Sequence, residues 1–278
     1  MLNKNRLNHT PNHTLRNMPT GVSIVIPNWN HEYLLPRSIQ SALMGAKQLQ
    51  QHDIPADVLV IDDHSRDGSL TLLRQLEALY FDDGLRLIAL PENVGVVAVR
   101  NLALECASYR YILFMDADNE LIPENIYMFV RAIQDTEAAM VYGNLIRRGP
   151  VAAYVDMFNN ESFQNHIFQR NYIDTFSLYD RHQIFDVRGY QSIPMMQSHE
   201  DWELILHLAA SGRKMVFVPV LMGIYYDLPS SFVNPTRSAE FEFERKSYID
   251  RVFNQLGIRF HQEPNTYHLR YHPDVGYI

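Results

Sequence analysis

The chain has 278 residues, of which 46% are hydrophobic, so it can form one large domain or two small ones around a substantial core. Its formal net charge of −8 argues against a general nucleic-acid binder, which needs a basic surface to bind phosphates. A single cysteine, Cys106, excludes an internal disulfide and fits a reducing compartment, and no apolar run approaches the ~18 residues that span a bilayer.

Strands and helices are predicted to alternate through the first half. Residues 1–20 are polar and rich in asparagine, which predicts a flexible leader. Apolar runs predict strands at 22–27, 56–63, 85–90 and 111–115, and helical spacing predicts helices at 31–44, 69–80, 95–107 and from Pro123 to about Thr136. Strands that are apolar throughout and separated by helices predict an α/β fold with a Rossmann-like, mainly parallel sheet covered by helices on both faces.

Polar residues follow each predicted strand. The four clusters read PNWN, DDHSRDGS, PENVG and DADNE in chain order. Ligands of parallel sheets bind beyond the carboxyl ends of the strands, so these clusters predict one site at that edge of the sheet.

The turn after the first strand limits the chemistry of this site. A nicotinamide dehydrogenase would have a glycine-rich turn there, but this turn is Asn28-Trp29-Asn30, and a P-loop is also absent from the sequence. A glycine cradle for phosphates is therefore not expected.

Asp116 and Asp118 suggest a divalent cation instead. In an extended segment, side chains at i and i+2 share a face roughly 7 Å apart, and Ala117 between them is small. A small bend would bring both carboxylates toward one Mg²⁺ or Mn²⁺, which also accepts substrate phosphates and water. In the alternative interpretation, Asp116 ends the strand and Asp118 begins a turn before the next helix.

The segments VSIVIPNWN, VLVIDDHSRDGS, NVGVVAVRN, YILFMDADNELIP and HEDWELILHLAASGRK occur in the order and spacing of the family 2 glycosyltransferases. The chain resembles that family over roughly residues 21–228. The resemblance implies a GT-A domain at 21–234, with a nucleotide-binding half at about 21–136 and an acceptor half at about 137–234. Residues 235–278 are then a C-terminal helix and tail.

The resemblance also implies an activity. Members of the family transfer a sugar, mostly with inversion, from a nucleoside-diphosphate sugar to a hydroxyl group. For this chain it implies a hexosyltransferase of polysaccharide biosynthesis that uses a UDP-sugar and a glycan, lipid-linked or small-molecule acceptor. We expect a cytoplasmic protein, peripheral to the membrane at most, that binds no nucleic acid.

Four residues are expected to bind the nucleotide by resemblance. Asp63 matches the family acid that accepts a hydrogen bond from the base, whereas Asp62 is interpreted as a turn residue. Pro27 and Trp29 fall where the family lines the nucleoside pocket, and Trp29 either stacks on the base or belongs to the core. Arg100 matches the family arginine near the base and diphosphate, although a bare arginine there would usually be a solvated helix position.

The resemblance implies that the segment Asp116-Ala117-Asp118 also contacts the nucleotide-sugar and that its two acids hold the cation. Asp118 matches the acid bonded most directly to the metal, Mn²⁺ or Mg²⁺, and Asp116 matches the acid that reaches ribose or a metal-bound water.

The general base is expected at the start of a helix in the second half. The segment SHEDWELILHLAASG predicts a helix that ends near Gly212, with a buried stripe of Trp202, Ile205, Leu208 and Ala209. By resemblance Asp201 is the base that deprotonates the acceptor hydroxyl. The alternative is structural, because an aspartate in the first turn, three residues after Ser198, can cap the helix.

The chain departs from the family after its last strand. Many relatives have a tyrosine-arginine-x-histidine segment there, but residues 225–231 read YYDLPSS, so Ser230 or Ser231 is a candidate phosphate ligand. The amphipathic helix expected at 236–256 either docks on the domain or forms a homodimer. His268 and His272 are spaced as helical zinc ligands, but Pro273 favours a solvated tail.

Two other functions are weighed against the transferase. A sugar nucleotidyltransferase would need a glycine-rich basic loop after the first strand, which is missing. A non-catalytic GT-A-like protein that binds a glycan or a partner is disfavoured because Asp63, Asp118 and Asp201 are all present.

Overall fold

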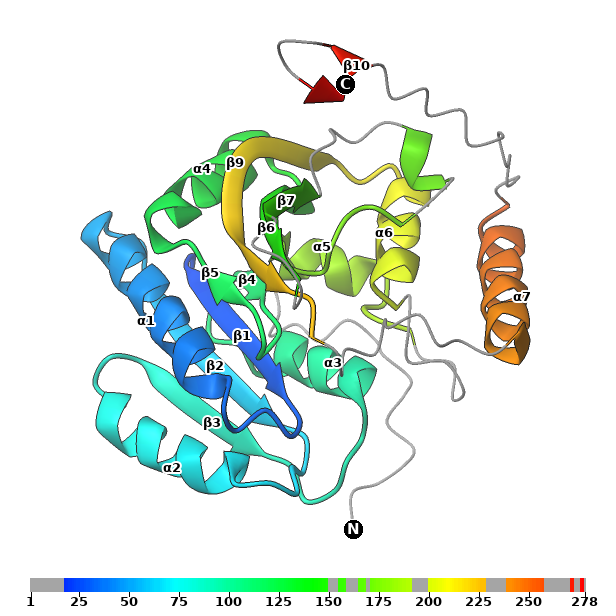
Figure 1. Cartoon of the computed structure of the whole chain (residues 1–278). Coiled ribbons are helices and arrows are strands. Elements are labelled where there is room, and N and C mark those ends of the chain that lie inside the picture. Colours follow the sequence, from blue (N-terminus) through cyan, green and yellow to red (C-terminus); the bar gives the residue numbers. More distant parts are fainter. Residues whose placement is uncertain are drawn as a thin grey trace.

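The computed structural model describes residues 18–149, 155–158, 165–168, 171–191, 200–228, 239–257, 271–272 and 276–277. Most of the leader expected at 1–20 lies outside these residues. So do the candidates Ser198, Ser230, Ser231 and His268. The strands β1 to β9 form one curled sheet, and helices pack around it (Figure 1). In chain order, the first half contains β1 (Val22–Asn28), α1 (Leu35–Gln51), β2 (Ala56–Asp62), α2 (Ser69–Tyr80), β3 (Leu85–Ala89), α3 (Val96–Cys106) and β4 (Tyr111–Phe114).

The four expected strands form one parallel block. Their order in the sheet is β3-β2-β1-β4, and Val25 of β1 lies opposite Leu59 of β2 and Phe114 of β4. Because parallel strands point the same way, the residues that follow β1, β2 and β4 all leave the sheet at one edge. The parallel α/β sheet expected from the sequence is confirmed for this half.

The second half completes a nine-stranded sheet with mixed directions. Its elements are β5 (Glu120–Leu121), η2 (Pro123–Asn125), α4 (Ile126–Thr136), β6 (Met140–Arg148), β7 (Val155–Phe158), η3 (Asn165–Phe168), β8 (Leu178–Asp180), α5 (Arg181–Asp186), α6 (Glu200–Ala210) and β9 (Met215–Tyr226), followed by α7 (Ala239–Leu256), β10 (Tyr271–His272) and β11 (Gly276–Tyr277). Strand β8 runs antiparallel to both β4 and β6, whereas β6 and β9 are parallel. The site edge is therefore flanked by a strand of opposite direction, which brings in residues from before β8.

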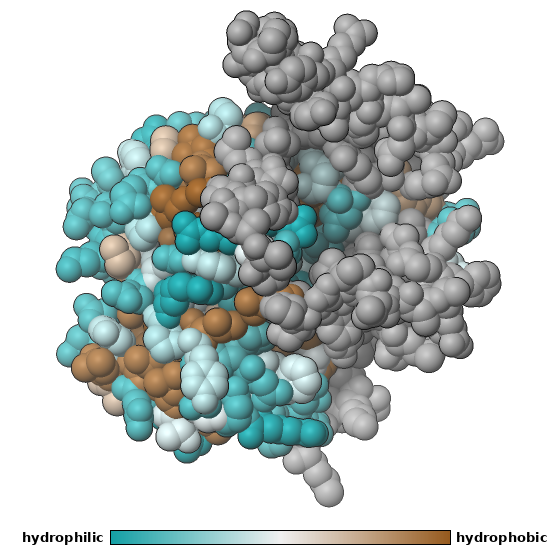
Figure 2. Space-filling view, viewed as in Figure 1, coloured by the Kyte–Doolittle hydropathy of each residue, from teal (hydrophilic) through white to brown (hydrophobic). Residues whose placement is uncertain are grey.

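Two hydrophobic clusters cover the two faces of the sheet. Side chains of β1 alternate between them, with Ile24 and Ile26 facing α1 and α4 while Val25 faces α3 and α6. The described surface seen in Figure 2 is mainly hydrophilic, with smaller hydrophobic areas. Within the described residues, no helix has the length and apolar character needed to cross a bilayer.

Helix α7 is part of this core. Phe253 packs edge-on against Trp202 of α6 at 6.1 Å between ring centroids, and Tyr248 donates a hydrogen bond to Glu203. Tyr248 and Phe253 are each 2% exposed. Of the two interpretations of this helix, docking onto the domain is the one observed.

Arg181 fixes the end of α3. Its side chain is 2% exposed and donates hydrogen bonds to the carbonyl oxygens of Leu104, Ala107 and Tyr109. Burial lowers the pKa of this arginine to about 10, so its charge is retained at neutral pH. The guanidinium satisfies carbonyls that the last turn of a helix leaves without partners, and it thereby anchors the helix that carries Arg100.

Gly143 lets β6 pass close to α4 and β9. A Cβ atom at this position would lie 2.4 Å from Cε1 of Phe129 and 2.6 Å from the carbonyl oxygen of Val220. Gly212 differs, because nothing lies within 4 Å of its Cβ position but its φ angle is +67°.

We expect Gly143→Ala to lower the free energy of unfolding by about 2 kcal/mol, because the backbone carbonyl cannot move aside. Gly212→Ala should lower it by about 1 kcal/mol through its left-handed backbone alone. Urea denaturation of both variants measures the difference. An unchanged Gly143→Ala protein would contradict the crowding argument.

Candidate active site

The loops after β1 and β2 are joined at the base of the site. Asn28 donates a hydrogen bond from Nδ2 to Oδ1 of Asp62 at 2.7 Å, and Ser65 donates from its hydroxyl to the same oxygen at 2.6 Å. Asp62 is 1% exposed and also accepts the backbone N–H of Ser65. Asp62 therefore ends β2 and its carboxylate holds the turn that follows, in agreement with the interpretation of a strand-end or turn acid.

Asp63 anchors the loop that leads into α3. Its carboxylate is 4% exposed and accepts the backbone N–H of Val94 at 2.7 Å and of Gly95 at 2.9 Å. Each oxygen of a carboxylate has a second acceptor site, so a hydrogen bond from a nucleotide base remains compatible with this anchoring. A base bound to Asp63 would lie beside the loop that positions α3.

Trp29 lies on the surface of the predicted nucleotide pocket. Its side chain is 49% exposed, so the interpretation of Trp29 as a core residue is wrong. Pro27 is partly buried at the end of β1. The loop that carries Trp29 is fixed by hydrogen bonds from Asn30 N to the Ser65 hydroxyl and from Arg66 N to the Asn30 side chain.

Asp116 and Asp118 lie on a tight turn formed by residues 116–119, the acidic turn. The backbone N–H of Asn119 donates to the carbonyl oxygen of Asp116 at 3.0 Å, and Ala117 inside the turn is 2% exposed. The expectation of an extended segment is therefore wrong, because β4 ends at Phe114 before the acids begin. Burial, reinforced by the negative charge of Asp116, raises the pKa of Asp118 to about 7.

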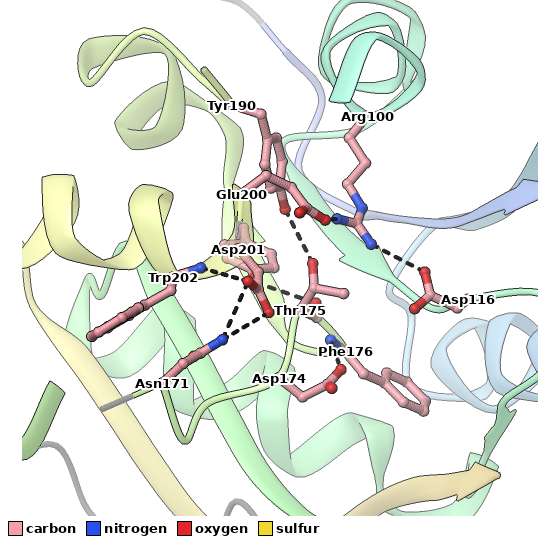
Figure 3. Close-up of polar contacts among 11 residues, drawn as sticks. Arg100, Asp116, Asn171, Asp174, Thr175, Phe176, Tyr190, Glu200, Asp201 and Trp202 are labelled. Atoms are coloured by element: carbon pink, nitrogen blue, oxygen red, sulfur yellow. Dashed lines mark hydrogen bonds and ion pairs between the residues drawn. The ribbon is translucent and has the colours of Figure 1, made fainter. Parts of the chain in front are cut away.

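Arg100 lies between Glu200 and Asp116 in Figure 3. The residue is 3% exposed. It donates one hydrogen bond from Nη1 to Oε1 of Glu200 at 2.5 Å and another from Nη2 to Oδ1 of Asp116 at 3.2 Å. Burial opposes its charge, but the carboxylates of Asp116 and Glu200 hold its pKa above the ordinary value. The alternative of a solvated helix position is therefore wrong. This side chain links the end of β4 to the start of α6.

Asp201 lies beside this ion pair in the first turn of α6. Its two carboxylate oxygens are each 3.3 Å from Nδ2 of Asn171, and Oδ1 accepts the backbone N–H of Trp202. Burial raises the pKa of Asp201, and the negative charge of Asp116 adds to this rise. Asp116 and Asp201, expected on the donor and acceptor sides, thus lie within electrostatic reach of each other (Figure 3).

Asp174 is a carboxylate that the sequence analysis missed. It precedes β8, accepts the backbone N–H of Phe176 at 2.8 Å, and lies in the same cluster (Figure 3). Burial raises its pKa to about 7, with further contributions from the charges of Asp116 and Asp201. The apolar pattern that would indicate a strand after Asp174 was weak because β8 has only three residues. Its antiparallel pairing with β4, which brings residue 174 to the acidic turn, is not visible in the sequence.

Tyr225 at the end of β9 connects Asp118 to this cluster. Burial and the negative charges of Asp174, Asp116 and Asp118 raise the pKa of its hydroxyl. Four carboxylates are therefore gathered at one edge of the sheet: Asp116, Asp118, Asp174 and Asp201.

The acidic turn fits a hard divalent cation whose coordination is completed by the substrate. Two nearby carboxylates, of which Asp118 is partly buried, form an oxygen donor set, and cation binding would relieve their mutual repulsion. No group of three His, Cys, Asp or Glu side chains able to hold a metal occurs within the part of the chain that the structure describes. Mg²⁺ and Mn²⁺ sites with only one or two carboxylates take their remaining ligands from water and phosphates.

Comparison with known families gives one clear match. The model of the family described as "Glycosyl transferase family 2" matches residues 23–192, which is more than half of the chain. The matched segment includes β1 to β4 and the acidic turn.

Curated relatives cover parts of the chain. It is 28% identical over 172 residues to glycosyltransferase AglE of Haloferax volcanii, covering 60% of this chain and 55% of the relative. It is 32% identical over 123 residues to the UDP-Glc:alpha-D-GlcNAc-diphosphoundecaprenol beta-1,3-glucosyltransferase WfgD of Escherichia coli, covering 44% and 45%. The chain thus spans about half the length of these relatives.

Solved structures share the fold. A crystal structure of residues 1–349 of S. aureus TarS in complex with UDP-GlcNAc matches with a TM-score of 0.66 at 18% identity, over 87% of this chain and 68% of that one. The mannosyltransferase PcManGT from Pyrobaculum calidifontis, in complex with GDP-Man and Mn²⁺, matches with a TM-score of 0.56 at 15% identity, over 85% and 64%. The expected GT-A fold is confirmed.

The pKa of Asp174 makes stability depend on pH. An unfolded aspartate titrates near 3.9, whereas the folded pKa is about 7, so between these values the folded protein retains a proton that the unfolded chain has lost. This group therefore destabilises the fold progressively as pH rises toward 7. We expect Asp174→Asn to melt at a higher temperature than the parent protein at pH 8, with the difference shrinking toward pH 5.

Thermal melts from pH 5 to pH 8 test this expectation. Asp135→Asn, which changes an exposed carboxylate on α4, is the matched control and should show no such trend. A constant difference for Asp174→Asn across the range would contradict the raised pKa.

Proposed function

This chain belongs to glycosyl transferase family 2, and from that premise we propose that it transfers a sugar from a nucleoside-diphosphate sugar to an acceptor hydroxyl with inversion. The observation that carries the proposal is the double ion pair of Arg100, which joins the acidic turn to the start of the helix bearing Asp201. A direct displacement needs the leaving group and the base within one cavity, and this contact supports that arrangement.

We assign the nucleotide to the loops after β1 and β2. The exposed ring of Trp29 offers a surface on which a base can stack, beside Pro27, and Asp63 offers an acceptor for a ring N–H. Uracil is the proposed base, supported by the UDP-Glc in the name of WfgD and the UDP-GlcNAc bound to TarS. The GDP-Man bound to PcManGT makes guanine the alternative to test.

Asp118, with Asp116, would hold a Mn²⁺ or Mg²⁺ ion beside the diphosphate. When bound, such an ion neutralises the charge that develops on the departing nucleoside diphosphate. The Mn²⁺ in the PcManGT complex supports this assignment. Arg100 keeps Asp116 oriented toward the site through a contact of 3.2 Å.

Asp201 is the proposed general base. The acceptor oxygen attacks the anomeric carbon as the bond from that carbon to the diphosphate oxygen breaks, and the hydroxyl proton passes to Asp201. Asn171 orients the carboxylate through its amide group. In a retaining mechanism Glu200, the residue before Asp201, would have to attack the sugar. Arg100 donates a hydrogen bond to Glu200 at 2.5 Å, and this supports a single inverting displacement.

The proposed acceptor is a hydroxyl of a glycan or a lipid-linked glycan, and the proposed sugar is a hexose. Among the relatives, WfgD acts on a diphosphoundecaprenol-linked sugar, and the poly(ribitol-phosphate) beta-glucosyltransferase of Bacillus spizizenii is 22% identical over 88% of this chain. One name describes glucosyl transfer to a lipid-linked sugar and the other names a polymer, and polysaccharide biosynthesis is the pathway class that we propose for this chain.

We expect UDP together with Mn²⁺ to raise the melting temperature by more than the sum of the two separate shifts, because each would complete the binding site of the other. Asp118→Asn should abolish this synergy while leaving the shift with UDP alone. Asp135→Asn is the control. Additive shifts in the parent protein would contradict the bridging cation, and a larger shift with GDP would reassign the base.

Asp201→Asn should retain donor binding and lose transfer by about a thousandfold, since general-base catalysis contributes roughly 10² to 10⁴. Isothermal titration with UDP and Mn²⁺ measures binding, and mass spectrometry of sugar transfer to candidate acceptors measures turnover. Equal losses of binding and turnover would instead indicate the capping role of this aspartate.

A further inference from the structure

Arg37 lies in an unusual place for a cation. It occupies the first turn of α1, which contains no acidic residue, so its charge faces the positive end of the helix dipole. A basic residue at this position destabilises a helix locally. A residue that breaks a local rule in this way needs compensation from its surroundings or a role in function.

The surroundings of Arg37 connect three segments. Its Nη2 donates a hydrogen bond to the carbonyl oxygen of Asp118 at 2.6 Å, and its guanidinium carbon lies 3.7 Å from the ring centroid of Tyr226 at the end of β9. Nε is 4.0 Å from the carboxylate of Glu120, which in turn accepts a hydrogen bond from the Tyr226 hydroxyl at 2.9 Å. A planar guanidinium donates this hydrogen bond while its flat face stacks on the ring, a geometry that the compact ammonium group of lysine does not reproduce.

The acidic turn is held from its other side by Asn119. Its Oδ1 accepts the backbone N–H of Tyr226 at 3.2 Å, and Asn119 is 1% exposed. One turn further along α1, the hydroxyl of Ser41 accepts the backbone N–H of Leu121 at 3.1 Å. Helix α1 and strand β9 therefore clamp the turn, and Arg37 is the part of the clamp that reaches Asp118 itself.

We infer that Arg37 is a positioning residue for the cation site, which fixes the main chain of Asp118 so that its carboxylate meets the cation and the donor diphosphate in a set orientation. The inference rests on the proposed function. The ring of Tyr226 at the end of β9 supports the guanidinium of this arginine, which comes from α1.

Isothermal titration of UDP in the presence and absence of Mn²⁺ tests the inference without measuring turnover. For Arg37→Ala we expect the dissociation constant for UDP with Mn²⁺ to rise about tenfold, a typical effect of losing a hydrogen bond from a charged donor. UDP binding without metal should not change. The melting temperature should shift by no more than about 2 °C, because the variant also removes an unfavourable charge from the helix start.

Two further variants separate geometry from charge. Arg37→Lys should recover less than half of the lost affinity, and full recovery would assign the effect to charge alone and overturn the inference. Arg131→Ala removes an exposed arginine of α4 that pairs with Asp135, and as the matched control it should bind like the parent protein.

The outcomes distinguish the inference from the function on which it rests. A parent protein whose UDP affinity does not increase with Mn²⁺ would contradict the proposed metal-dependent function. A normal increase that Arg37→Ala retains would contradict only the positioning role. Equal weakening of UDP binding with and without Mn²⁺ would make Arg37 a general structural residue and would likewise overturn it.

Discussion

A buried positive charge organises this molecule. Arg100 is enclosed between the parallel half of the sheet and α6, where an unpaired charge would be strongly destabilising. Asp116 and Glu200 supply the compensation, and they belong to the two halves of the domain. The acidic turn and α6 cannot separate at this point without leaving uncompensated charges in the interior, so the electrostatics of one side chain fixes how this turn faces the start of α6.

The helix that carries Arg100 is held at both ends. At its start, Asp63 accepts the backbone N–H groups of the preceding loop, and at its end Arg181 binds the free carbonyl oxygens. The proposed contact with the nucleotide base and the link to α6 are thus parts of one rigid body.

The sequence predicted what depends on local patterns, and it missed what depends on tertiary pairing. The four parallel strands were visible because each is apolar throughout, and the acids at their ends could be located for the same reason. The ion partner Glu200 is 100 positions from Arg100, and Arg37 is 81 positions from the carbonyl that it binds. No periodicity records such contacts. The sequence did not indicate Asp174, because the antiparallel strand after it has only three residues and so shows almost no hydrophobic pattern.

Helix α7 has a consequence for how the protein can be divided. The sequence suggested a boundary at residue 234, but Trp202 and Glu203 of α6 have partners in Phe253 and Tyr248 beyond it. A shortened chain that stops at that boundary would expose an indole ring and a carboxylate on the helix that carries Asp201. A chain that extends through Leu256, the last residue of α7, keeps these contacts.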